Sequence, residues 1–145
     1  EDSISKINKI NLDKEYIKDW IIGFIETKGS FYFTKKRIED TGILNSSLDY
    51  EEIAEFSISV TNEEKLLIEI GKIIGLSIKS QVLISSNKLC VLSAVTLEDI
   101  QRIINFICDG KRVKLKGIKK VKFLLWISKL RTLRKYQSLK IPNKY

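Results

Sequence analysis

Hydrophobic residues recur at steps of three and four along residues 13–28, the spacing that places them on one side of an α-helix. Asp13 is a residue type that caps helix starts, and Gly29 can take the left-handed conformation that ends a helix. Gly23, in the middle, costs about 1 kcal/mol of helix propensity relative to alanine. We therefore expect another backbone to pass close to Gly23. The apolar positions of this helix are Tyr16, Ile17, Trp20, Ile21, Phe24 and Ile25.

The hydrophobic period changes to two after Gly29, which is typical of strands with one buried face. The expected strands are residues 30–37, 52–60, 78–84 and 88–95, with a polar loop over 38–50 and a hairpin turn over 85–87. In the second strand, the residues predicted to face the core are Ile53, Phe56, Ile58 and Val60. The outer face of the sheet is predicted to carry Tyr32, Thr34, Lys36, Glu55, Ser57, Ser59, Lys79, Gln81 and Ser93.

Three further helices are expected. Thr61 and Glu64 are spaced as a capping box at the start of a helix that ends at Gly75. Thr96 caps the next helix, and the last helix covers residues 118–133. The apolar positions of these helices are Leu66, Leu67, Ile70, Ile73, Ile74, then Leu97, Ile100, Ile103, Ile104, Ile107, then Val121, Leu124, Leu125, Ile127 and Leu130.

The order of elements, α-β-β-α-β-β-α-α, indicates an α+β fold in which helices cover one face of a mixed four-stranded sheet. A chain of 145 residues suits one domain. The predicted division is an N-terminal extension over residues 1–12, a single domain over 13–133, and an exposed basic tail over 134–145. The opposite face of the sheet is left open for another molecule.

Positive charge is concentrated at one end of the chain. Residues 110–145 contain 13 Lys or Arg and no Asp or Glu, and since the net charge of the chain is +8, the other 109 residues carry −5. A solvated lysine-rich helix is one interpretation. A nucleic-acid partner explains the pattern better, because unpaired charge of one sign repels itself. A module that binds only proteins through the open sheet face is disfavoured for the same reason.

Other compositional features exclude several classes of site. The chain has no His, and its two cysteines, Cys90 and Cys108, are both predicted to face a core. A zinc site or a disulfide framework is therefore not expected, and the thiols fit a reducing compartment. No apolar run approaches the length of a membrane span. Ile and Lys, which have A/T-rich codons, supply 45 residues, which favours an organellar origin and a mitochondrial location.

Residues 21–29, with the sequence IIGFIETKG, followed by Ser30 and Phe31, resemble the LAGLIDADG helix of homing endonucleases and intron maturases. The element order of that family, αββαββα, matches the predicted order. The stretches 115–131 and 140–143 also resemble the C-terminal halves of fungal mitochondrial intron-encoded maturases. The resemblance implies that helices of two domains pack together at a glycine and that two sheets form a saddle over nucleic acid.

One motif implies one half of such a saddle. The partner would be an identical chain, another domain of the same product, or a different protein. The resemblance places Ile22, Gly23 and Glu26 at the interface with it. An ordinary amphipathic helix with an incidental glycine is the alternative.

The chain departs from the family at the eighth residue of the motif. The family has a metal-binding acid there, and this chain has Lys28. Mg²⁺-assisted hydrolysis of a phosphodiester needs carboxylates, and an ammonium repels the metal. Glu26 points about 200° around the helix axis from Lys28, so it is interpreted as a structural acid, with a substitute metal ligand as the alternative. No catalytic residue, metal or cofactor is therefore expected, and Mg²⁺ would be needed only in an active endonuclease.

The best candidates for contact with phosphates are the basic residues near the C-terminus. The resemblance would match Lys114 or Lys116 to a lysine that assists the cleavage centre, and without a metal acid it would neutralise phosphate instead. Trp126 and Tyr136 could stack on unpaired bases, although the spacing of Trp126 is more typical of a core residue. The predicted nucleic-acid-binding residues are Lys36, Lys79, Lys111, Arg112, Lys114, Lys116, Lys119, Lys120, Lys122, Arg131, Arg134 and Lys135.

These observations favour a catalytically degenerate LAGLIDADG protein that binds structured RNA, either as a maturase-like factor or as part of a ribonucleoprotein such as an organellar ribosome. The alternative is one half of an active Mg²⁺-dependent DNA endonuclease. RNA is preferred over DNA because the predicted outer face of the sheet is poorer in Arg and Gln than a reader of DNA bases.

Overall fold

The computed structural model describes residues 14–37, 50–77, 82–110 and 112–142. The predicted positions 1–13, 38–49, 78–81, 111 and 143–145 lie outside the described residues. The elements, in chain order, are α2 (Lys14–Lys28), β1 (Gly29–Arg37), β2 (Tyr50–Thr61), α3 (Glu64–Ile74), β3 (Leu83–Ile84), β4 (Leu89–Ala94), α4 (Leu97–Ile107), β5 (Cys108–Asp109), β6 (Arg112–Val113), α5 (Gly117–Thr132) and the short 3-10 helix η1 (Arg134–Tyr136).

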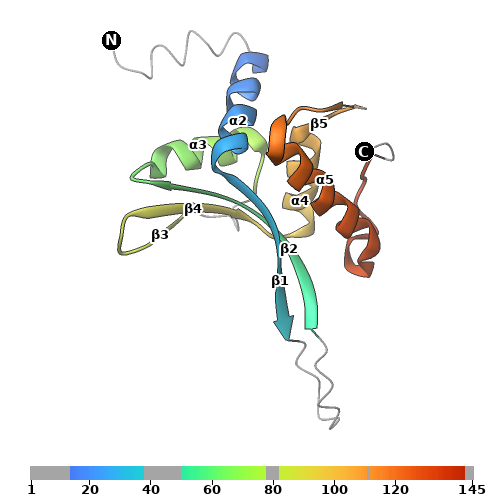
Figure 1. The fold of residues 1–145 in the computed structure, drawn as a ribbon. Coiled ribbons are helices and arrows are strands. Elements are labelled where there is room, and N and C mark those ends of the chain that lie inside the picture. The colour runs from blue at the N-terminus through green and yellow to red at the C-terminus, as the bar shows by residue number, and fades with distance from the viewer. Residues whose placement is uncertain (1–13, 38–49, 78–81, 111, 143–145) are drawn as a thin grey trace.

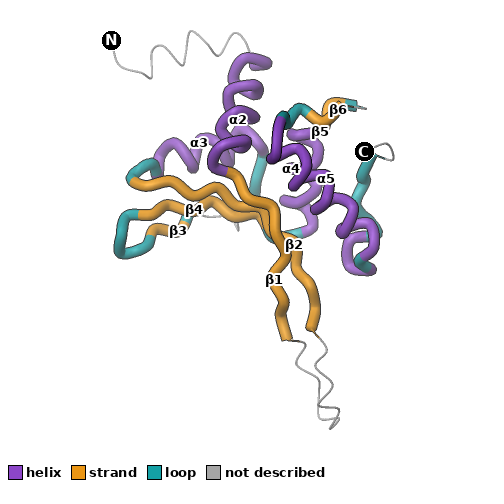
Figure 2. The backbone as a smooth tube through the Cα atoms, in the orientation of Figure 1, coloured by secondary structure: helices purple, strands orange, loops and turns teal. Residues whose placement is uncertain are grey.

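Four strands form the central sheet in the order β1-β2-β4-β3, and α2, α3, α4 and α5 gather on one side of it (Figure 1). This confirms the predicted α+β fold. The described strands of this sheet all pair antiparallel. The prediction of a mixed sheet is therefore wrong. A separate two-stranded hairpin, β5-β6, follows α4 and leads into α5 (Figure 2). That hairpin was not predicted, because two-residue strands carry no periodic signal.

The face of the sheet that the helices cover carries the core. On β2, Ala54, Phe56 and Ile58 are fully buried beneath the helices. Ile53 stands directly opposite Thr34 on β1 and shares its outer face, so its predicted place in the core is wrong. The error is one of parity, because Ile53 and Phe56 cannot face the same side of a regular strand.

Helix ends were predicted with mixed success. Thr96 accepts a hydrogen bond from the Asp99 amide, and Gly75 ends α3 in the left-handed conformation, as predicted. The capping box at Thr61 is wrong, because Thr61 ends β2 and α3 begins only at Glu64. Gly29 is also not left-handed and begins β1 instead. It must be glycine for another reason: a Cβ there would lie 2.8 Å from the Ile25 carbonyl oxygen.

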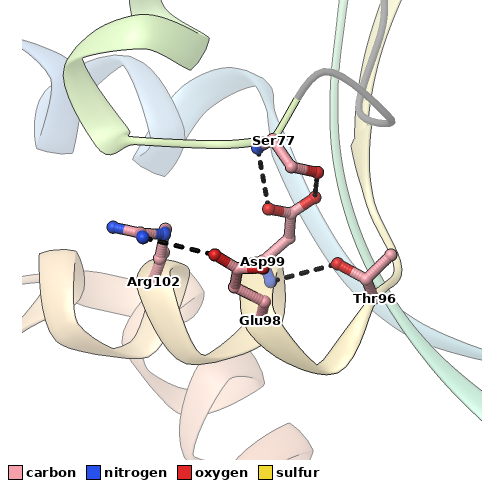
Figure 3. Close-up of polar contacts among 5 residues, drawn as sticks. All are labelled: Ser77, Thr96, Glu98, Asp99 and Arg102. Atoms are coloured by element: carbon pink, nitrogen blue, oxygen red, sulfur yellow. Dashed lines mark hydrogen bonds and ion pairs between the residues drawn. The ribbon is translucent and has the colours of Figure 1, made fainter.

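A buried carboxylate fixes the start of α4 to the end of α3 (Figure 3). Asp99 has no exposed surface, and its Oδ1 and Oδ2 accept hydrogen bonds of 2.9 Å from the amide and the hydroxyl of Ser77. Its own amide is held by Thr96. The neighbouring pair, Glu98 and Arg102, lies on the exposed side of the same helix at 3.3 Å.

The segment after α5 packs on the domain, and the expectation of an exposed tail is wrong for its described part. Tyr136 is buried, and its hydroxyl accepts a 2.7 Å hydrogen bond from the amide of Ala54 on β2. β4 pairs with β2 only from Phe56 onward, so it offers no hydrogen-bond acceptor to the amide of Ala54. The hydroxyl of Tyr136 takes that place. Gln101 holds the backbone of Lys140 from α4, and Leu139 and Ile141 pack against the core.

Candidate nucleic-acid interface

One face of α2 is largely exposed in the described chain. Gly23 is exposed, and a Cβ built on it meets no atom within 4 Å. On the same part of the helix, Tyr16 is 56% exposed and Trp20 is 47% exposed, with the Trp20 ring stacked on Phe24. Aromatic rings beside an uncovered glycine form a surface that another helix could cover.

Ile22 does not fit the predicted interface with a partner domain. Ile22 is buried in the core of this chain, with 4% of its surface exposed, so its side chain is not on the free face of α2. The apolar face predicted from the sequence also included Tyr16 and Trp20, which lie outside the core. The buried stripe is Ile21, Ile22 and Ile25. Glu26 is half-buried at the other end of the helix.

The C-terminal end of α2 is surrounded by positive charge. Lys28, the last residue of the helix, is exposed, and the next carbonyl, that of Gly29, accepts a hydrogen bond from the ammonium of Lys119 on α5. An ammonium is favoured at that place, because the C-terminal end of a helix carries partial negative charge. Burial, and then repulsion from Lys122, lower the pKa of Lys119.

These residues do not fit a magnesium ion. Mg²⁺ needs oxygen ligands, chiefly carboxylates, and Glu26 is the single acid in the last turn of α2. Among the described residues, three or more His, Cys, Asp or Glu side chains nowhere gather as a metal would require. Lys119 occupies the Gly29 carbonyl, and the adjacent Lys28 adds a second positive charge.

The basic residues of the C-terminal region divide into two groups. One group forms ion pairs: Lys129 with Glu52 at 2.7 Å, Lys135 with Glu51 at 3.4 Å, and Lys114 with Glu15 at 3.9 Å. The second group is exposed and, within the described chain, forms no ion pair with an acid. Its members among the predicted nucleic-acid-binding residues are Arg112, Lys116, Lys120, Lys122 and Arg134. Arg131 is half-buried and donates to the Pro142 carbonyl.

The two groups of basic residues differ in how readily they could bind a phosphate. A lysine already held by a carboxylate must break that contact to reach a phosphate, whereas an exposed, unpaired lysine does not. We call the second group, together with Lys119, the basic surface. Of the lysines that the resemblance would place at a cleavage centre, Lys114 lies near the start of α2 and Lys116 precedes α5. Lys119, which the resemblance did not single out, contacts the motif helix at its C-terminal end.

The part of the basic surface that α5 carries lies on the helix side of the sheet, not on its outer face. Phe123 and Trp126 of α5 pack on Phe31, which places α5 on the helix side of the sheet. Lys36 is exposed on the other side, in register with Glu51. Lys36 is therefore not part of the basic surface, and Lys79 and Lys111 lie outside the described residues. Trp126 and Tyr136 are buried, which excludes base stacking on either.

The outer face carries a pair that the sequence did not reveal. The Tyr32 hydroxyl donates to Oε2 of Glu55, which stands directly opposite on β2. Burial raises the pKa of Glu55. Cross-strand register was the missing information, because it decides which residues of two strands become neighbours.

No described helix has the length and apolar character that crossing a membrane demands. A comparison with models of known protein families gives no match. The chain is 27% identical over 152 residues to a Schizosaccharomyces pombe protein, "Probable intron-encoded endonuclease Cox1-I1b". The alignment covers 99% of this chain but only 36% of that relative, so the chain spans about a third of its length.

Solved structures share the fold. The LAGLIDADG homing endonuclease I-LtrWI, bound to its target DNA, superposes with a TM-score of 0.68 at 20% identity over 88% of this chain and 41% of its own. The archaeal intron-encoded homing endonuclease I-Vdi141I, complexed with DNA, gives 0.64 at 21% identity over 83% and 71%. The homing endonuclease I-TnaI gives 0.63 at 20% identity over 79% and 73%. The chain therefore shares the fold of LAGLIDADG homing endonucleases, resembles their motif at residues 21–29, and is similar in sequence to an intron-encoded endonuclease.

Proposed function

We propose that the chain is a catalytically degenerate LAGLIDADG protein that binds structured RNA, as an intron-maturase-like factor or as a component of a ribonucleoprotein. The observation that carries this proposal is the cationic end of α2. Lys28 stands where the family has its metal acid, and the ammonium of Lys119 contacts the adjacent Gly29 carbonyl. A site with this charge attracts phosphate and repels a divalent cation.

The placement of the basic surface supports RNA over duplex DNA. The DNA-bound LAGLIDADG homing endonuclease I-LtrWI shares the fold, yet among the described residues the outer face of this sheet has few cations: Lys36 is exposed there beside Glu51, and Glu55 lies near its centre. The unpaired lysines lie instead on the helix side, along α5. A folded RNA can present phosphates to such a surface through its backbone.

A partner domain is part of this proposal. The exposed face of α2 around Trp20 and Gly23 would pack against a second LAGLIDADG domain or another protein. The relative that is about three times as long has room for a further domain. An organellar, mitochondrial location is proposed from the abundance of Ile and Lys, whose codons are A/T-rich, and from the intron-encoded relative.

The test is a binding comparison on the full chain. A pool of structured RNAs and a pool of duplex DNAs of equal length would be titrated with protein at several salt concentrations, with and without Mg²⁺. We expect tighter binding to the RNA pool, with affinity that falls steeply as salt rises. Preferred binding of duplex DNA together with Mg²⁺-dependent cutting would instead support the alternative, one half of an active endonuclease.

A further inference from the structure

A carboxylate on the open face of the sheet is held by a neutral donor. Glu55 is half-buried on β2, and the hydroxyl of Tyr32, directly across on β1, donates to its Oε2. Within the described residues Glu55 forms no ion pair with a Lys or Arg. This differs from Glu51 and Glu52 on the same strand, which Lys135 and Lys129 neutralise. Glu55 is therefore an acid left available on a surface that faces away from all the helices (Figure 1).

Short hydroxyl side chains lie beside Glu55 on the same face. Ser57, two residues on, stands in register with Ser30 of β1 and Ser93 of β4, so three serines form a row across the sheet. Ser57 is buried, with 6% of its surface exposed, whereas Ser93 is half-buried and Ser30 is exposed. Serine hydroxyls are short and can donate or accept hydrogen bonds. Tyr32 is 36% exposed, which leaves an aromatic ring next to the carboxylate.

The chemistry of this group selects its ligand. An ionised carboxylate only accepts hydrogen bonds and repels phosphate, so a nucleic acid can approach it only with donor groups on a base. Guanine is the best match, because its N1–H and N2–H donors lie side by side and both can reach one carboxylate. The corresponding edges of cytosine, adenine and uracil place an acceptor next to the donor. These edges are free only in unpaired nucleotides, which sequence-specific RNA binders use.

The geometry points to a guanine-binding site on the outer face of the sheet, in which Glu55 accepts from N1–H and N2–H of an unpaired guanine and Tyr32 orients the carboxylate. This inference rests on the proposed RNA binding and adds a base preference to it. Partial burial of Glu55 supports the assignment, because a carboxylate that has lost some water gains more from new donors.

The experiment selects ligands from a random RNA pool with the full chain and with Glu55→Gln, then measures binding of one selected RNA in which single guanines are replaced by inosine. Inosine lacks the N2 amino group. We expect one guanine whose replacement weakens wild-type binding about tenfold or more. Glu55→Gln should bind the guanine and inosine RNAs equally, because an amide offers a donor where guanine needs an acceptor. Tyr32→Phe should reduce the difference in affinity between the guanine and inosine RNAs without abolishing it.

Three results would overturn the inference. If Glu55 only repels nucleic acid, Glu55→Gln will raise affinity for every RNA equally, and the inosine effect will persist. If the sheet instead binds a duplex, selection from the RNA pool will enrich no unpaired guanine. Selection from a duplex DNA pool will then enrich a cytosine with the wild-type chain but not with Glu55→Gln. If neither pool is enriched, the proposed RNA binding fails along with the inference.

Discussion

At the scale of single residues, burial separates two acids that are neighbours in the sequence. Asp99 is fully buried and accepts from both the amide and the hydroxyl of Ser77, whereas Glu98 forms an exposed ion pair with Arg102 (Figure 3). A buried donor that loses its acceptor is costly, while an exposed ion pair contributes little. Two adjacent alanine substitutions therefore provide a matched comparison.

We expect Asp99→Ala to lower the free energy of unfolding by about 1–3 kcal/mol, because the Ser77 amide is left without an acceptor. Glu98→Ala should lower it by less than about 1 kcal/mol. Urea unfolding of both variants, monitored by circular dichroism, measures the difference. Equal losses for the two variants would show that Asp99 does not connect α3 to α4 in solution.

Thiol chemistry gives a second prediction at this scale. Burial raises the pKa of Cys108 from 9.0 to about 11, so its reactive thiolate is about a hundredfold scarcer at pH 8 than in an ordinary thiol. In a Cys90→Ala background, alkylation of Cys108 by iodoacetamide should be slower than that of glutathione by about this factor. Mass spectrometry of timed samples measures the rate. A rate close to that of glutathione would contradict the burial of Cys108.

Residue-level expectations from the sequence succeeded where one local rule decides the outcome. The Thr96 cap and the left-handed Gly75 follow from short-range geometry, and both are confirmed. The roles assigned to Gly29 and Ile53 were wrong, because each depends on a contact or register outside its own segment. The Tyr32–Glu55 pair could not be predicted either, since its two residues are brought together only by the pairing of β1 with β2.

At the scale of elements, α2 and α5 each carry more apolar surface than the core of this chain uses. On α5, Phe123, Trp126, Ile127 and Leu130 are buried, while Val121 and Leu125, predicted for the core, are 54% and 67% exposed. Periodicity located both helices correctly but could not say which of two apolar stripes meets the sheet. The buried Tyr136 was missed for a related reason, because a 3-10 turn has no periodic pattern.

Gly23 gives the prediction for α2. No atom lies within 4 Å of a Cβ at this position, so both Gly23→Ala and Gly23→Leu should fit the isolated chain. Gly23→Ala should raise the stability of the dilute chain by up to about 1 kcal/mol of helix propensity. Gly23→Leu should also fold, but it should abolish packing of α2 against a partner helix, because the larger side chain separates the two backbones.

Thermal unfolding at low concentration and sedimentation velocity, alone or with a candidate partner domain, separate the two effects. Gly23→Ala serves as the control, because it changes propensity with little added volume. Unchanged association of Gly23→Leu, at unchanged stability, would mean that this face of α2 meets solvent, and the two-domain saddle would have to be abandoned.

At the scale of the whole molecule, the proposed catalytic degeneracy predicts that the chain does not cut DNA. With Lys28 in place of the acid and Lys119 at the Gly29 carbonyl, the isolated chain should not nick or cut plasmid DNA with Mg²⁺ or Mn²⁺. Gel analysis of supercoiled plasmid after long incubation checks this. Metal-dependent nicking that disappears in Glu26→Gln would identify Glu26 as a ligand and contradict the proposed degeneracy.

The charge distribution was predicted from the sequence, but which lysines are free to bind was not. Lys120 and Lys122 are exposed and form no ion pair in the described part of the chain, whereas Lys129 and Lys135 are held by Glu52 and Glu51. All four lie in the same basic stretch and look alike in the sequence. Only the fold, which brings the start of β2 beneath the end of α5, distinguishes them.

A pair of double variants tests this division. Lys120→Ala/Lys122→Ala should weaken RNA binding and reduce the slope of log affinity against log salt by about one to two units, because two phosphate contacts are lost. Lys129→Ala/Lys135→Ala removes the same charge but should change the slope less and lower thermal stability more, because its lysines bind carboxylates of the sheet. Filter binding from low to high salt, with melting curves of each variant, measures both quantities. Equal slopes for the two variants would show that RNA responds only to net charge, and the basic surface would then be an ordinary solvated face.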